Sequence, residues 1–84
     1  MPDLELYKDA ILTVDILSDG LRAGDIGTVV ECHQVPSVAE DGYSVEFFDM
    51  TGRTVAVVTL PASNLRAPTS SDLPAVRERA KTTG

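Results

Sequence analysis

Cys32 and His33 are adjacent and are the single cysteine and the single histidine of the sequence. A thiolate beside an imidazole would suit a zinc ion or a nucleophilic cysteine. A zinc site needs about four ligands, however, and carboxylates would have to supply the rest. Adjacent residues of a strand also point to opposite faces, so this pair is poorly placed to share one ion. We therefore expect Cys32 to be a small apolar side chain of the core.

Other catalytic arrangements lack residues that their chemistry requires. A Ser–His–Asp set would have only His33 as its base, and no glycine-rich loop for a phosphate is present. Glu40, Asp41 and Asp49 offer oxygen atoms for calcium, but no loop has ligands at alternate positions. A solvated acidic rim is the simpler interpretation. The sequence therefore predicts no enzymatic activity, no metal and no cofactor.

A turn that leads into a strand is predicted at Gly24, Asp25, Ile26 and Gly27. Glycine adopts the left-handed backbone conformations that turns require, and Gly27 inside a strand pattern indicates a bulge or a close backbone crossing. Asp25 could contact a ligand, but such side chains more often bond nearby backbone amides and fix the turn. We therefore interpret Gly24, Asp25 and Gly27 as structural.

We expect several residues after position 39 to contact another protein. Phe48 falls on the strand face opposite Tyr43 and Phe47, and exposed aromatic side chains often anchor protein interfaces. Cover by a loop or by the C-terminal segment is an equally good interpretation of Phe48. The predicted partner-binding residues are Glu40, Asp41, Phe48, Asp49 and Arg53.

Charge divides the sequence into an acidic body and a basic end. The net charge is −6, with 11 acidic and 2 basic side chains in residues 1–50 but 2 acidic and 5 basic ones in residues 51–84. An acidic body repels phosphate backbones, so a basic protein is the expected partner and nucleic acid is not. A contribution to solubility alone is the alternative.

Length and segment composition indicate one small domain. The 84 residues allow a single domain, and one cysteine provides no disulfide framework. Residues 1–6 lack the basic and apolar parts of a secretion signal, and the apolar runs fall far short of the ~20 residues that span a bilayer. We therefore expect a cytoplasmic protein that does not associate with membranes.

Turn signals divide most of the chain into short strands. Strands are predicted over residues 10–17, 26–34, 42–48 and 53–60, with a fifth fragment at Leu65 and Arg66. A loop over residues 35–41, a hairpin turn at residues 49–52 and a 3₁₀ turn at residues 61–64 connect them. Short strands with regularly spaced turns favour a mainly β fold, here a small five-stranded SH3-like barrel over residues 1–67.

Residues 68–84 are predicted to be a linker followed by a weak C-terminal helix or a disordered tail. The helix would cover residues 72–81, with Ser71 or Asp72 as its cap and Pro74 in its first turn. Leu73 and Val76 give it little apolar support, and a helix this short is marginal in water.

Three spaced blocks resemble the small bacterial family catalogued as domain of unknown function 4926. The blocks are residues 20–31 (GLRAGDIGTVVE), residues 43–47 (YSVEF), and residues 58–62 (VTLPA) with Leu65 and Arg66. The resemblance spans residues 7–67 and implies a compact SH3-like fold and a small stand-alone bacterial protein, without an assigned activity. The first block also resembles the KOW motif of ribosomal and transcription-elongation proteins and the SH3-like barrel of nitrile hydratase β subunits.

The leading hypothesis is a non-catalytic, acidic, protein-binding accessory module. One concrete form is an antitoxin or immunity-type protein that covers a basic surface of a neighbouring gene product. The alternatives are a KOW-like contact with nucleic acid or the ribosome, and a homo-oligomeric structural unit. Such a unit would pair edge strands or the strand from Val55 to Leu60, which is apolar on both faces. The basic residues that usually flank a nucleic-acid-binding KOW turn are reduced here to Arg22.

Overall fold

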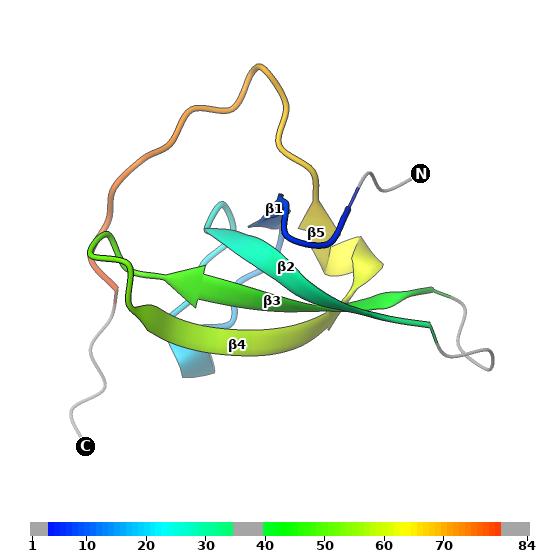
Figure 1. Ribbon diagram of the computed structural model, residues 1–84. Coiled ribbons are helices and arrows are strands. Elements are labelled where there is room, and N and C mark those ends of the chain that lie inside the picture. Colours follow the sequence, from blue (N-terminus) through cyan, green and yellow to red (C-terminus); the bar gives the residue numbers. More distant parts are fainter. Residues whose placement is uncertain (1–3, 35–39, 80–84) are drawn as a thin grey trace.

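Five antiparallel strands form one sheet in the computed structural model, which describes residues 4–34 and 40–79 (Figure 1). The strand order is β4-β3-β2-β1-β5. The strands are β1 (Asp9–Leu12), β2 (Ile26–His33), β3 (Gly42–Phe48), β4 (Thr54–Pro61) and β5 (Leu65–Arg66), with 3₁₀ turns η1 (Leu17–Asp19) and η2 (Ala62–Asn64). The mainly β prediction is confirmed. The ladder ends at β4 and β5 without pairing them, so closure into a barrel stays a prediction.

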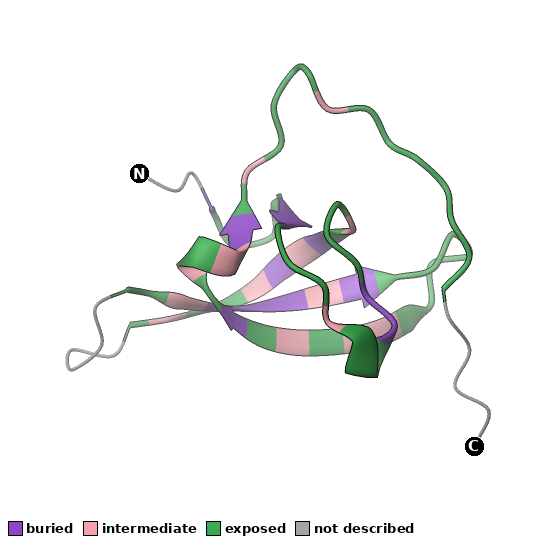
Figure 2. Ribbon diagram, turned by 180° about the vertical axis from the view of Figure 1, so that it is seen from behind, coloured by how far each residue is buried: buried purple, intermediate pink, exposed green. Residues whose placement is uncertain are grey.

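Alternation along β3 places the core where the sequence predicts it. Tyr43, Val45 and Phe47 are buried, and Val45 lies opposite Val29 of β2 and Val58 of β4. Figure 2 shows this burial along β3, beside the more exposed β4. Full burial of each large apolar side chain stabilises the fold by about 1.5–3 kcal/mol. These residues belong to a larger core cluster, which also contains Leu4, Ala10, Leu12, Leu21, Leu60 and Leu65.

At Gly27, β2 is packed tightly against β3. Gly27 is paired with Phe47, and a Cβ atom there would meet Val45 Cγ1 at 2.5 Å and the Glu46 carbonyl oxygen at 2.9 Å. The predicted close crossing at Gly27 is thus present, whereas the bulge of β2 lies further on, between Val29 and Glu31.

The first strand is shorter than the expected residues 10–17, because it ends at Leu12. The backbone of Ile16 instead pairs with Leu21, through N–H···O bonds of 2.9 and 3.0 Å. Gly20 closes this small hairpin with a left-handed φ of 71°. The β-branched residues after Leu12 therefore belong to a separate loop that folds back on itself, which overrides their preference for a continuous strand.

Of the two alternatives for the C-terminal segment, the helix over residues 72–81 is wrong over residues 72–79, which contain no helix. Residues 80 and 81 lie outside the described part. Asp72 closes a turn instead, because its carboxylate accepts the Thr69 amide at 2.7 Å and pairs with Arg66. Leu73 and Val76 are 87% and 82% exposed. Because this short segment covers no apolar surface, it gains too little free energy from packing to remain helical.

Replacement of Gly27 by alanine should destabilise the fold, because the new methyl group overlaps Val45 Cγ1. We expect Gly27→Ala to lower the free energy of unfolding by about 1–3 kcal/mol, measured by urea denaturation. Gly42→Ala is the matched control, since a Cβ there meets nothing closer than 3.7 Å. Equal stability of the two variants would contradict this account of the crossing.

Candidate functional site

The five predicted partner-binding residues lie at the two ends of β3. Phe48, Asp49 and Arg53 are at the β3–β4 hairpin, whereas Glu40 and Asp41 precede Gly42 at the other end. A seven-residue strand separates the two groups, which corresponds to about 20 Å of extended chain. The fold therefore brings three of the residues together and leaves two apart, and they do not form one compact site.

The Asp49 carboxylate makes hydrogen bonds within the β3–β4 hairpin, which it closes. Its Oδ1 accepts the backbone amides of Thr51 at 2.8 Å and Arg53 at 3.0 Å, and the Thr51 hydroxyl at 2.6 Å. Gly52 supplies the left-handed residue of this turn, with φ of 89°. The Thr51 hydroxyl and these amides hold the pKa of Asp49 below its usual value. This hydrogen bonding gives Asp49 a structural role in the hairpin.

Glu40 and Asp41 connect the beginning of β3 to η2. The Glu40 carboxylate accepts the Ser63 amide at 2.7 Å and the Ser63 hydroxyl at 3.2 Å. The Asp41 carbonyl oxygen accepts the Ala62 amide at 2.9 Å. This acidic pair therefore helps to position the turn that leads from β4 to β5, and both residues are also exposed.

Exposed apolar side chains gather around β4 and the hairpin. Phe48 is 44% exposed, Met50 is 86% exposed and Val57 is 59% exposed. Val57 lies opposite Glu46, on the face of the sheet away from Val45 and Phe47. An aromatic, a methionine and a β-branched side chain offer the kind of apolar contact that protein interfaces use.

The outer edge of β4 is the longest unpaired strand edge in the described residues. β4 pairs with β3 alone, and its eight residues carry no charge. Natural edges are usually blunted by lysine, proline or a bulge, and here Pro61 stands only at the last position. A bulge lies at the other end, next to Val55, whose carbonyl oxygen accepts Arg79 Nη1 at 3.4 Å. Among the described residues, the middle of β4 therefore presents backbone donors and acceptors that no other strand uses.

A row of polar side chains crosses the outer face of the sheet, which sequence reasoning missed. Ser44 Oγ lies 2.9 Å from His33 Nε2 and 2.8 Å from Thr59 Oγ1, and Glu31 Oε1 lies 3.5 Å from the same His33 nitrogen. A catalytic triad needs the carboxylate on the other ring nitrogen and an accessible hydroxyl. Ser44 is only 6% exposed, so this row joins three strands and does not form a nucleophilic site.

Cys32 is exposed, contrary to its expected role as a core side chain. It lies opposite Tyr43 near the end of β2, beyond the bulge and away from the centre of the core. Across residues 4–34 and 40–79, no group of three His, Cys, Asp or Glu side chains is close enough to hold a metal ion.

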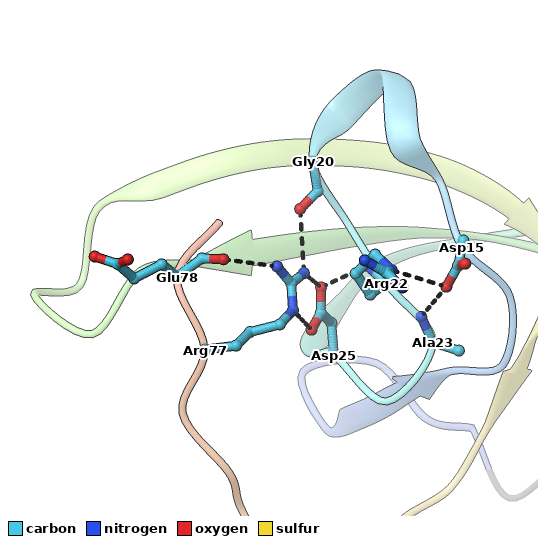
Figure 3. A network of polar contacts seen from close by, with 7 residues as sticks. All are labelled: Asp15, Gly20, Arg22, Ala23, Asp25, Arg77 and Glu78. Atoms are coloured by element: carbon cyan, nitrogen blue, oxygen red, sulfur yellow. Dashed lines mark hydrogen bonds and ion pairs between the residues drawn. The ribbon is translucent and has the colours of Figure 1, made fainter. Parts of the chain in front are cut away.

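Asp25 fixes its turn and also holds the C-terminal segment (Figure 3). Its carboxylate accepts the Arg22 amide at 2.8 Å and Arg77 Nε at 3.1 Å, and it also pairs with Arg77 Nη2. Gly24 has the left-handed φ of 97° that the turn needs. The sequence gives no sign of the contact between Arg77 and Asp25, because 52 residues separate them.

A second carboxylate supports the same loop. Asp15 accepts the Ala23 amide at 2.8 Å and lies 3.5 Å from Arg22 Nε. The Ala23 amide, assisted by the charge of Arg22, holds the pKa of Asp15 below its usual value. Two carboxylates therefore position the backbone between residues 20 and 25, and Arg22 is drawn to one of them.

The lowered pKa of Asp49 predicts a loss of stability in acid. Because the folded state favours its ionised form, the contribution is present above the usual pKa of about 4 and disappears as the pH falls through the lower folded-state pKa. We expect the urea midpoint to fall between about pH 4 and pH 2, and to fall less in Asp49→Asn, whose amide oxygen still accepts the turn amides. Asp19→Asn is the control, as its carboxylate makes no hydrogen bond in the described residues. An unchanged acid slope in Asp49→Asn would contradict the assignment.

Comparison with known proteins identifies a family for this chain. Searches of curated proteins and of solved structures find nothing similar. Within the described ranges, no helix has both the length and the apolar character needed to cross a membrane. The family model described as "Domain of unknown function (DUF4926)" matches residues 6–67, from just before β1 to just after β5. Because the match covers most of the 84 residues, this chain belongs to the DUF4926 family.

Proposed function

We propose that this protein is a non-catalytic, acidic protein-binding module of a bacterial cell, and that it receives an extended segment of a partner along the free edge of β4. The observation that carries this proposal is the uncharged, eight-residue edge strand with pairing on one side only. An added strand would satisfy the free N–H and C=O groups of β4. Backbone bonding supplies affinity in this mode, and side-chain pockets supply specificity.

Side chains beside the edge support the same mode of binding. Val57 is exposed at the middle of β4, and Phe48 is exposed at the hairpin. Burial of either under a partner would remove apolar surface from water, at about 25 cal/mol per Å². The two would thus add apolar contact to the backbone pairing.

Charge indicates the kind of partner. The net charge is −6, and 11 of the 13 acidic residues lie before residue 51. A basic protein would be attracted to this body and would associate faster at low salt. An antitoxin or immunity-type role, in which the module covers a basic toxin encoded by a neighbouring gene, is one concrete form of the proposal.

A second copy of the chain is the alternative occupant of the edge. In an antiparallel β4–β4 pair, Arg53 at one end of the strand would lie near Glu40 at the other end of the partner copy, because Glu40 bonds Ser63 just beyond Pro61. This arrangement repeats by two-fold symmetry and places opposite charges together twice. Nucleic acid is less favoured, since Arg22, the single basic residue of the KOW-like block, lies beside Asp15.

Val57→Lys is expected to abolish partner capture, because a charge on an edge strand opposes strand addition. The measurement is quantitative mass spectrometry of proteins that co-purify with the tagged chain from its native host. We expect at least a tenfold loss of the specific partner, which corresponds to about 1.4 kcal/mol. Leu73→Lys is the matched control, since it adds the same charge to an exposed apolar residue outside the sheet.

The two occupants give different results in the same comparison. If β4 pairs with a second copy, light scattering of the pure wild-type protein reports a dimer and Val57→Lys reports a monomer. If β4 receives another protein, both are monomers and only wild type and Leu73→Lys retain the captured partner. Equal capture by all three proteins would rule out the β4 edge.

A further inference from the structure

The loop between Asp15 and Asp25 contacts one side of the Arg77 guanidinium group. Arg77 donates from Nε to Asp25 Oδ1 at 3.1 Å and from Nη2 to the Gly20 carbonyl oxygen at 3.1 Å, and Nη2 also bonds Asp25 Oδ2 (Figure 3). Two carboxylate oxygens and one carbonyl oxygen therefore meet one planar group. This fork geometry is selective for arginine, because the ammonium group of lysine cannot make the same paired bonds.

The acceptors of this site are positioned without Arg77. The Arg22 amide holds the Asp25 carboxylate at 2.8 Å, and the Asp25 amide bonds back to the Arg22 carbonyl oxygen at 3.0 Å. Gly20 is fixed by its left-handed φ and by the bond from its amide to the Leu17 carbonyl oxygen at 3.0 Å. All of these groups come from residues 17–25, so the site is preorganised within the acidic body.

The residue that fills the site belongs to a segment with few other attachments. The chain after β5 passes outside the sheet and returns beside the β3–β4 hairpin (Figure 1). Leu73 and Val76 point into solvent, and residues 73–79 form neither helix nor strand. Ion pairs near a surface contribute little stability and weaken with salt, so Arg77 can leave the site at low cost.

We propose that this loop is a binding site for an arginine side chain of a basic partner protein, and that Arg77 is its internal, exchangeable ligand. A partner arginine takes the place of Arg77 on Asp25 and Gly20, and the C-terminal segment is released. The excess of acidic residues before residue 51 favours the approach of such a partner. This site is separate from the β4 edge, and neither proposal depends on the other.

The test uses the full chain with Arg77→Ala, which empties the site and leaves the sheet intact because Arg77 lies outside it. The probe is the peptide acetyl-Ala-Val-Arg-amide, and the readout is the backbone amide NMR shifts of residues 20–25. We expect saturable shifts with Arg77→Ala and about threefold weaker binding to wild type, in which Arg77 competes as a tethered ligand. The lysine version of the peptide should bind more weakly, and the uncharged citrulline version should not bind.

Asp25→Asn in the Arg77→Ala background is the control for the site itself. The asparagine side chain keeps an oxygen for the Arg22 amide, so the turn persists while the ionic acceptor is lost, and we expect arginine-peptide binding to disappear. The proposal is overturned if the Arg77→Ala protein shows no saturable shifts at millimolar peptide. It is equally overturned if citrulline binds as well as arginine, if Asp25→Asn binds unchanged, or if wild type and Arg77→Ala bind alike.

Discussion

The close contact of Gly27 with Val45 and Phe47 is the constraint on which the rest of the fold depends. Only a residue without a side chain fits there, since a Cβ atom would lie 2.5 Å from Val45 Cγ1. The same glycine lies opposite Ala10 of β1, so one position joins the strands on both sides. Tight packing at this crossing buries Val29, Val45 and Phe47 together, which a small domain needs because it has little apolar area to bury.

Local patterns were enough to predict the strands that flank this crossing. Alternation identified Tyr43, Val45 and Phe47 as the buried face of β3. The preference of glycine for left-handed backbone conformations identified the turn at Gly52. The 3₁₀ turn and the two-residue fifth strand were also predicted, because proline and asparagine mark such connections. Each of these features is decided by residues within a few positions of one another, which is why the sequence reveals them.

Features that depend on particular hydrogen bonds or on strand register, at short or long range, were not predictable from residue patterns. The strand after Asp9 was extended too far, since the pairing of Ile16 with Leu21 ends it early. The C-terminal helix is absent over residues 72–79 because Asp72 bonds Thr69 and Arg66. For the candidate site, the sequence identified Asp49 by type, but only the structure shows its hydrogen bonds to the hairpin amides. Contacts across the sheet, such as Ser44 with His33, depend on register, which composition does not encode.

An uncharged free edge on an acidic body is the feature that connects this fold to the proposed role in binding, and hydrogen exchange of the β4 amides tests that proposal most directly. The measurement compares the free protein with the complex purified from the host. Strand addition predicts that alternate β4 amides around Val57, which face away from β3, exchange rapidly in the free protein and at least tenfold more slowly in the complex. Unchanged exchange along β4, with new protection on another surface, would contradict the account.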